Sequence, residues 1–219
     1  MKRILLIGTG GTIASENTDD GLSPMLGSDQ LLRCVPRIAK LCDVECFELM
    51  CVESTNVTPS EWLDISRCIE QNYDAYDGFV ISHGTDTMAY TAAALSYLVR
   101  HSEKPIVMTG AQKPIGMDGT DAKQNLLDAF TYACDDCASG VSVVFDGKAI
   151  LGTRARKVRT KSFSAFASIS SVSSYSEYGW PFRSCARTFV ANSMPPMPAP
   201  AKISGCASTL REVMKPPKL

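Results

Sequence analysis

The stretch KRILLIGTGGTIAS, residues 2–15, decides the fold. Its apolar run, Ile4–Ile7, is unbroken, which predicts a strand buried on both faces, as in a parallel sheet. Three glycines at positions 8, 10 and 11 then let the backbone turn and come close to a ligand. Thr12 follows directly, and open α/β sheets bind ligands at the carboxyl ends of their strands. We therefore expect Thr12 to lie in a site whose other residues come from later strands.

The composition is that of an ordinary globular protein, with 45% hydrophobic and 21% charged residues among 219. A net charge of −1 gives no electrostatic reason to expect nucleic acid or a membrane as a partner. No apolar run approaches the ~20 residues of a membrane helix. The run Ile4–Ile7 is also shorter than the roughly 7–15 apolar residues of a signal peptide. We therefore expect a cytoplasmic protein.

Nine cysteines are scattered along the chain. Without a signal peptide, they are expected to be reduced and mostly buried, acting as small hydrophobic side chains. Cys134 and Cys137 form a C-x-x-C pair, but no second pair lies nearby. The two histidines, His83 and His101, lack metal-ligand spacing to it. We expect two cysteines at a helix end rather than a zinc site, and no metal.

Strands and helices alternate up to about residue 150, which predicts a doubly wound α/β fold built on a parallel sheet. Strands are predicted at residues 4–7, 44–52, 79–81, 105–108 and 141–145. Helices are predicted over residues 29–41 (interrupted by Pro36), from Thr58 onward, and over 88–100 and 121–134. The polar residues 16–21 predict a mobile loop or a hairpin, and residues 146–147 and 150–152 predict turns.

Three of the predicted strand ends carry hydroxyl or carboxylate side chains. They are Thr12, the pair Ser54-Thr55 and the pair Thr85-Asp86. One polar strand end is common, but several that converge on one edge of a sheet describe a site. This convergence is the most informative feature of the sequence.

These residue types allow acyl transfer from an amide or an ester. A threonine hydroxyl is a poor nucleophile unless a base activates it, and Thr12 and Thr85 are both candidates. Asp86 could bind an ammonium group or orient a lysine, and Lys157, in a basic run, could act as the base if it is buried. The backbone of Gly10-Gly11 could donate hydrogen bonds to a developing oxyanion.

Each residue also has a purely structural interpretation. Thr12 could be a turn residue, and Thr85-Asp86 could cap the helix that follows. Lys157 in a basic run is typical of a solvated face, and His83 is expected to be a hydrogen-bonded structural histidine. Only the combination of the residues favours the catalytic interpretation.

A dinucleotide-binding protein is a second class to weigh. Gly8-Thr9-Gly10 after a strand begins the G-x-G-x-x-G/A fingerprint. However, Ile13 occupies its last position, and a polar loop follows where a helix should start. The oxidoreductase interpretation is therefore the weaker of the two.

The motifs closely resemble a known family, the bacterial and archaeal L-asparaginases of the cytosolic, type I-like branch. The resemblance covers residues 1–169 and keeps the family's order. The matching segments are ILLIGTGGTIAS (4–15), STNVTPSEW (54–62), YDGFVISHGTDTMAYTAAALSYL (76–98), PIVMTGAQKPI (105–115) and LGTRARKVRTKSFSAFASI (151–169).

The resemblance implies hydrolysis of L-asparagine, and more weakly of L-glutamine, to the acid and ammonia without a cofactor. Thr12 matches the family's first catalytic threonine, the usual nucleophile. Thr85, Asp86 and Lys157 match the second threonine with its aspartate and lysine. Whether both threonines attack, or one positions water, stays open.

The resemblance also implies a set of substrate contacts. Ser54 and Thr55 match the positions that hold the α-carboxylate, and Asp86 matches the contact to the α-ammonium group. Ala111 matches a residue whose backbone approaches the side-chain amide, and Gly11 is counted among the substrate-binding residues.

Two features depart from the family pattern. Many members carry a tyrosine on the loop after the glycine turn, whereas residues 16–24 contain none and Leu22 stands near its place. The family also continues into a second, smaller α/β domain and forms homodimers and tetramers whose sites lie between protomers. No such domain is recognisable in residues 170–219.

Residues 170–219 hold seven of the twelve prolines, nine serines, six Lys/Arg and two Asp/Glu. Such a segment can scarcely bury a core, so it is expected to be a disordered or non-native tail after a catalytic domain of residues 1–169. A truncated or frame-shifted reading frame would account for it. Weak or absent activity and impaired oligomerisation are then expected, because the second domain would not complete the site.

Two further functions are alternatives. Amidotransferase subunits that act on glutamyl-tRNA share an asparaginase-like domain, but they carry an additional N-terminal domain, whereas this sequence begins at the first strand. A non-catalytic remnant of the family is the other alternative.

Overall fold

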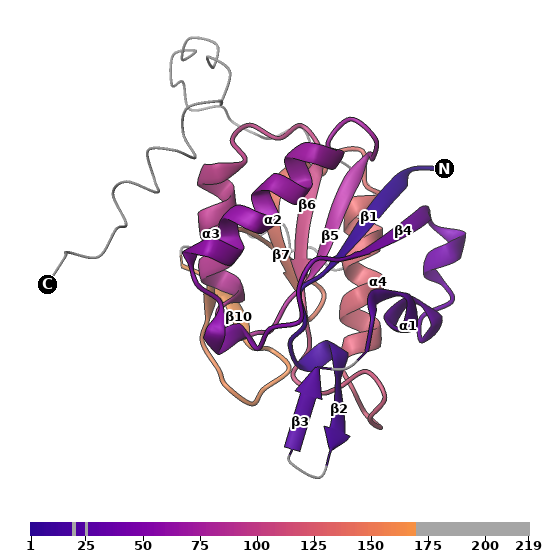
Figure 1. Ribbon diagram of the computed structural model, residues 1–219, viewed down its shortest axis with the longest axis vertical. Helices are drawn as coiled ribbons and strands as arrows, with labels where there is room; N and C mark the ends of the chain where they lie inside the picture. The colour runs from indigo at the N-terminus through magenta and orange to yellow at the C-terminus, as the bar shows by residue number, and fades with distance from the viewer. Residues whose placement is uncertain (19–20, 25, 170–219) are drawn as a thin grey trace, which may run out of the picture. The chain divides into compact units, whose positions relative to one another are not determined.

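The computed structural model describes residues 1–18, 21–24 and 26–169, so the predicted tail of residues 170–219 lies outside the described residues. A six-stranded sheet forms its centre, with the strand order β4-β1-β5-β6-β7-β8 (Figure 1). The strands are β1 (Arg3–Gly8), β4 (Asp43–Glu48), β5 (Gly78–Ser82), β6 (Pro105–Thr109), β7 (Gly140–Phe145) and β8 (Lys148–Leu151).

Strand β1 is an inner strand of the sheet, with a neighbouring strand on each side. It pairs in parallel with β4 on one side and with β5 on the other. Its side chains alternate between two cores: Ile4 and Leu6 face one, Leu5 and Ile7 the other. The prediction of a strand buried on both faces is therefore confirmed. In such a sheet the ligand crevice forms where the strand order reverses, here at the carboxyl ends of β1 and β5.

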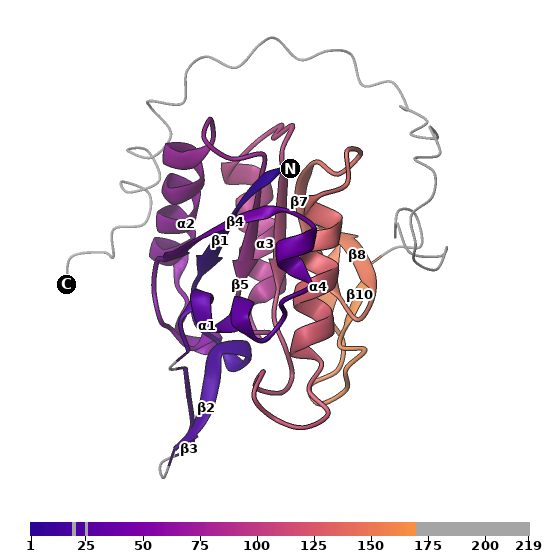
Figure 2. The same cartoon turned by 90° about the vertical axis from the view of Figure 1, so that its right-hand side faces the viewer.

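Helices cover both faces of the sheet, as a doubly wound fold requires. Helices α1 (Ser28–Arg33) and α4 (Ala122–Ala133) pack on one face, and α2 (Pro59–Asn72) and α3 (Met88–Leu98) on the other (Figures 1 and 2). The capping box at Thr58 forms as predicted, since Thr58 N donates to Glu61 Oε2 at 2.6 Å.

The sheet is mixed rather than wholly parallel, because β8 runs antiparallel to β7. Asp146 and Gly147, with φ of 52° and 67°, form the tight turn between them. Two consecutive residues with positive φ are typical of a two-residue hairpin, and Asp-Gly favours it. The turn predicted at residues 150–152 is therefore wrong in part: Ile150 and Leu151 belong to β8.

Smaller elements connect the layers. The polar segment after the glycine turn forms a hairpin of β2 (Ser15–Thr18) and β3 (Gly21–Pro24), one of its two predicted alternatives. The hairpin projects from the body of the fold (Figure 2). In the described part of the chain, short 3-10 helices form at η1 (Thr12–Ala14), η2 (Ile38–Lys40) and η3 (Ser54–Asn56). A second small sheet pairs β9 (Ala155–Lys157) with β10 (Phe166–Ser168).

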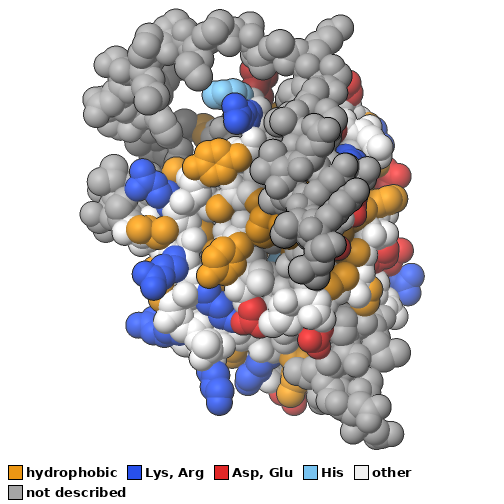
Figure 3. Space-filling view, turned by 60° about the vertical axis from the view of Figure 1, so that its left-hand side comes forward, with side chains coloured by type: hydrophobic (Ala, Val, Ile, Leu, Met, Phe, Trp, Pro, Cys, Tyr) orange, Lys and Arg blue, Asp and Glu red, His pale blue; other side chains and the backbone are white. Residues whose placement is uncertain are grey.

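The cysteines do not follow their prediction. Of the seven that are described, Cys42 and Cys68 are buried, whereas Cys34, Cys51 and Cys137 are exposed. The prediction of mostly buried thiols is therefore wrong for the described part of the chain. Some larger side chains are exposed as well: Tyr90 and Tyr97 on α3 are each 66% exposed. Figure 3 shows hydrophobic side chains exposed on one face of the molecule. Within the described ranges, no helix is long and apolar enough to cross a membrane.

Candidate functional site

Close backbone packing brings the ends of three strands together. Gly11 has a φ of +82°, and a Cβ added there would lie 2.3 Å from Gly84 N. A Cβ at Gly84 would in turn lie 2.6 Å from the Cβ of Ser54. Only glycine fits at these two positions, because any side chain would displace backbone or a buried serine. Thr12 follows Gly11 at the end of β1, and Thr85 follows Gly84 at the end of β5. The two threonines therefore lie on backbone segments that pack against each other.

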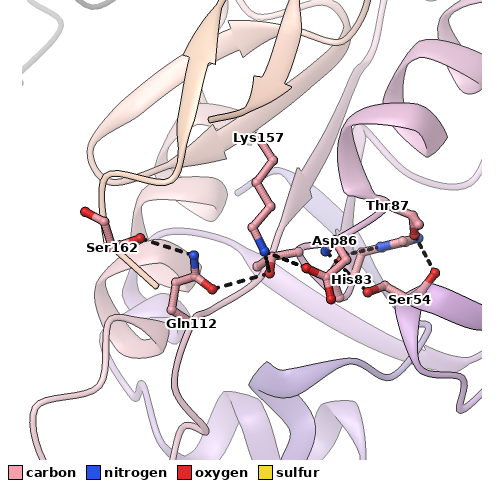
Figure 4. A network of polar contacts seen from close by, with 9 residues as sticks. Ser54, His83, Asp86, Thr87, Gln112, Lys157 and Ser162 are labelled. Atoms are coloured by element: carbon pink, nitrogen blue, oxygen red, sulfur yellow. Dashed lines mark hydrogen bonds and ion pairs between the residues drawn. The ribbon is translucent and has the colours of Figure 1, made fainter. Parts of the chain in front are cut away.

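Lys157 joins the end of β5 from a distant part of the chain. Its Nζ donates to Thr85 Oγ1 at 2.7 Å and to Asp86 Oδ1 at 2.7 Å. The lysine side chain is 12% exposed, whereas that of Asp86 is 57% exposed. Figure 4 shows the lysine reaching down onto Asp86. The solvated-face interpretation of Lys157 is therefore wrong, and the three side chains form one hydrogen-bonded group.

The small sheet β9–β10 directs Lys157 inward. Side chains alternate along a strand, so Ala155 and Lys157 point to one face and Arg156 to the other. Ala155 is buried and Arg156 exposed, which fits this alternation. On β10, Phe166 packs on Phe145 of β7, with ring centroids 5.0 Å apart. This contact anchors the small sheet on the core and fixes where the lysine reaches.

A chain of hydrogen bonds centred on the buried His83 supports the loop that carries Thr85. Trp62 Nε1 donates to Thr91 Oγ1 at 3.0 Å, and Thr91 Oγ1 lies 3.1 Å from His83 Nε2. His83 Nδ1 lies 2.7 Å from the carbonyl oxygen of Gly84. Because a carbonyl can only accept, Nδ1 carries the proton and Nε2 accepts from the threonine. Burial lowers the pKa of His83 to about 4, so the ring is neutral near pH 7. The prediction of a structural histidine is confirmed.

Ser54 is fixed from the same loop. Its Oγ accepts from Asp86 N at 3.3 Å, and its carbonyl oxygen accepts from Thr87 Oγ1 at 2.6 Å (Figure 4). Ser54 is buried and the neighbouring Thr55 is exposed. These contacts hold η3 against the loop of Asp86. The structural alternative, in which Thr85-Asp86 caps helix α3, is wrong: the N-cap residue is Thr87, with no side-chain capping bond.

Gln112 is a site residue that the sequence analysis missed. Its Oε1 accepts from Thr85 Oγ1 at 3.4 Å, and its Nε2 donates to the carbonyl oxygen of Ser162 at 3.1 Å. Asp121 holds its backbone, accepting from Gln112 N at 2.9 Å. Its position just after β6 could have indicated it, because it makes the end of β6 a fourth strand end with a polar side chain. Ala111, one residue earlier, is fully buried.

Thr12 differs from Thr85 in its surroundings. It opens η1 and is partly exposed. Among the residues that the structure describes, none forms a hydrogen bond with its hydroxyl, which is thus available to a ligand. No group of three or more His, Cys, Asp and Glu side chains in the described ranges is placed to hold a metal ion.

The fold and these contacts define a doubly wound α/β protein with two threonines at the sheet edge where the strand order reverses. One of them, Thr85, accepts a hydrogen bond from a lysine and is followed by an aspartate. A family model, "Asparaginase, N-terminal", matches residues 3–176. The chain belongs to the asparaginase family, and the resemblance of its motifs is confirmed.

Individual proteins agree with this assignment. The L-asparaginase of Thermococcus kodakarensis is 40% identical over 164 residues, 74% of this chain and 50% of that protein. Its solved structure has a TM-score of 0.69, with 39% identity, over 76% of this chain and 51% of that one. A glutamyl-tRNA(Gln) amidotransferase subunit of Pyrococcus furiosus is 36% identical over 167 residues, 72% of this chain and 38% of that protein. The chain spans about half the length of the L-asparaginase it matches.

Proposed function

We propose that the protein is an amidohydrolase that converts L-asparagine to L-aspartate and ammonia, with Thr12 as the nucleophile. The observation that carries the proposal is the position of Lys157 Nζ, 2.7 Å from both Thr85 Oγ1 and Asp86 Oδ1. A lysine held on a threonine hydroxyl can exchange protons with it, which is what amide hydrolysis requires.

The proposed reaction has two halves. The Thr12 oxygen attacks the carboxamide carbon and its proton passes to the Thr85–Lys157 pair. The carbon–nitrogen bond then breaks, and the nitrogen leaves as ammonia with a proton from that pair. Water cleaves the resulting ester and releases aspartate, returning the proton to Thr12. The backbone N–H groups at the Gly10-Gly11 turn are candidates to stabilise the oxyanion.

The substrate contacts are proposed from the positions that match the asparaginase family, and the geometry is consistent with them. Asp86 is the counter-charge for the α-ammonium group, since its carboxylate is more than half exposed beside Lys157. Ser54 and Thr55 would bind the α-carboxylate, because η3 is tied to the loop of Asp86. Gly11 and Ala111 would approach the substrate through their backbone. The reaction uses no cofactor in this scheme, and the cytoplasm is its expected compartment.

Ammonia release from asparagine and from glutamine tests the proposal. The full chain is compared with Thr12→Ala and Lys157→Ala. Thr153→Ala and Lys123→Ala are the matched controls, because both of these side chains are exposed and lie outside the site. We expect release from asparagine above that from glutamine, lost in the first pair of variants and kept in the second. Equal rates for all five proteins would overturn the enzymatic assignment.

The similarity to the amidotransferase of Pyrococcus furiosus supports a second candidate, a component that supplies ammonia for glutamyl-tRNA chemistry. This candidate predicts little hydrolysis of free asparagine by the chain alone. If the chain is a non-catalytic member of the family, it should release no ammonia from either amide. A cooperative unfolding transition would show that such a protein is nevertheless folded. The dinucleotide-binding alternative is disfavoured, because η1 and a hairpin follow the glycine turn where its fingerprint opens an α-helix.

A further inference from the structure

The carboxylate of Asp121 holds the loop that follows β6. Its Oδ1 accepts from Gln112 N and from Lys113 N, each at 3.1 Å, and its Oδ2 accepts from Gln112 N at 2.9 Å. Asp121 is the N-cap residue of α4, nine positions beyond Gln112. Hydrogen bonds from N–H groups to a carboxylate are charge-assisted and stronger than neutral ones. The backbone of Gln112 is therefore clamped to the start of α4.

Asn125, about one turn further along α4, holds the carboxylate in place. It is only 2% exposed, and its Nδ2 donates to Asp121 Oδ2 at 3.1 Å and to the carbonyl oxygen of Gly110 at 3.0 Å. Its Oδ1 accepts from Asp146 N at 3.0 Å, directly after β7. Buried polar networks whose members are satisfied are rigid. Asp121 is thus tied to the ends of β6 and β7, and the main sheet sets its position.

The side chain of Gln112 links this clamp to the candidate site. A side chain at Gly110 would collide with the carbonyl oxygen of His83, so the end of β6 lies directly against the end of β5. Gln112 Oε1 accepts from Thr85 Oγ1 at 3.4 Å, while Lys157 Nζ donates to that same oxygen at 2.7 Å. Because the lysine amine is the donor in its contact, the single hydroxyl proton of Thr85 points to Gln112. The direction of this hydroxyl therefore depends on where Gln112 is held.

We propose that Asp121 is a positioning residue for the reaction: it fixes Gln112 and, through Gln112, the hydroxyl of Thr85. This role rests on the amide hydrolysis proposed above, and it concerns the proton-transfer step rather than substrate binding. A misplaced catalytic group slows a reaction even when the substrate still binds. Loss of the clamp should therefore lower kcat and leave KM nearly unchanged, because the proposed substrate contacts of Asp86 and Ser54 lie on other loops.

Asp121→Asn tests the role with a side chain of nearly the same shape. The substitution turns one acceptor oxygen into an amino group, which then faces a donor N–H. We expect kcat for ammonia release from asparagine to fall about 3–10-fold, no further than in Gln112→Leu, with KM near the wild-type value. Asp118→Asn is the matched control, since Asp118 is exposed in the same loop and should tolerate the change. An unchanged kcat in Asp121→Asn would overturn the proposal.

A double-mutant cycle with Gln112→Leu separates positioning from a general loss of structure. If Asp121 acts through Gln112, Asp121→Asn should lower kcat in the wild-type chain but cause no further loss in the Gln112→Leu chain. A structural role that is independent of Gln112 would lower kcat by the same factor in both chains. Equal factors would therefore overturn the proposal.

Hydrogen–deuterium exchange of the full chain tests the clamp without an enzyme assay. The amides of Gln112 and Lys113 should be protected in the wild type and should exchange roughly tenfold faster in Asp121→Asn. Unchanged exchange in β5 would show that the variant is folded. Unprotected amides at both positions in the wild type would overturn the proposal, even if Asp121→Asn failed to fold. A wild type that is protected at both amides but releases no ammonia would instead refute the proposed hydrolysis, and with it the part of the clamp in catalysis.

Discussion

The amine of Lys157 lies 2.7 Å from the hydroxyl of Thr85, although 72 positions separate the two residues. The contact joins the small β9–β10 sheet to the end of β5, at the point where the strand order of the main sheet reverses. The proposed chemistry depends on this contact, because Lys157 is the group that would exchange protons with Thr85.

Replacing the lysine should abolish most activity and leave the fold intact. Lys157→Met keeps the length and apolar stem of the side chain but removes the amine. General acid–base groups contribute about 10²–10⁴-fold, so the rate of ammonia release should fall by that factor. The melting temperature should change little, because the partner Asp86 is largely exposed. Lys123→Met, on the exposed side of α4, is the control, and a Lys157→Met protein with the wild-type rate would refute the assigned role.

Gln112 should contribute more modestly. Gln112→Leu removes the acceptor of the Thr85 hydroxyl and the donor to the Ser162 carbonyl. One neutral hydrogen bond is worth about 0.5–1.5 kcal/mol, so we expect activity to fall about 3–10-fold. Gln112→Glu keeps the acceptor and should retain more activity than the leucine variant. Gln124→Leu on α4 is the control, and equal rates in Gln112→Leu and wild type would remove Gln112 from the site.

Gly84 should tolerate no side chain. Alanine there would place its Cβ 2.6 Å from the Cβ and 2.7 Å from the Oγ of Ser54. Such overpacking costs about 1–3 kcal/mol, measured as a lower free energy of unfolding in urea. Ammonia release should also fall, since Thr85 is the next residue. Gly116→Ala is the matched control, because a Cβ at Gly116 would meet no atom within 4 Å. Equal destabilisation by the two substitutions would contradict the packing argument.

Stability should depend on the protonation of His83. Its pKa is about 4 in the folded protein, against ~6.5 for an unperturbed histidine, so the unfolded chain binds more protons between these values. The histidine therefore contributes its full stability above pH 6.5, and about 3 kcal/mol of it is lost as the pH falls to 4.

Urea unfolding between pH 7 and pH 4 measures this dependence. His83→Asn should be less stable at pH 7 and should show a shallower decline. His101→Asn is the control, since His101 is exposed and its φ of 54° suits asparagine. Parallel pH profiles for wild type and His83→Asn would show that another group controls the acid sensitivity.

Local pattern was enough to predict most of the fold. The unbroken apolar run of β1, the capping box at Thr58 and the Ala-rich helix after Thr87 each specify their own element. Predictions failed where an element depends on a partner outside its own segment. Residues 148–151 become strand β8 because they pair with the neighbouring strand β7 across the predicted Asp-Gly turn. The burial of Lys157 depends on a more distant contact, Phe166 packing on Phe145. Gln112 was missed because its partners, Thr85 and Ser162, lie far away in the sequence.

The most direct test of the threonine mechanism is mass spectrometry of the full chain quenched with acid during turnover of asparagine. The proposal predicts an aspartyl ester on the tryptic peptide that contains Thr12, absent from Thr12→Ala, which should also release no ammonia. Thr153→Ala should behave as the wild type does. An ester on the Thr85 peptide instead, or ammonia release by Thr12→Ala at the wild-type rate, would contradict it.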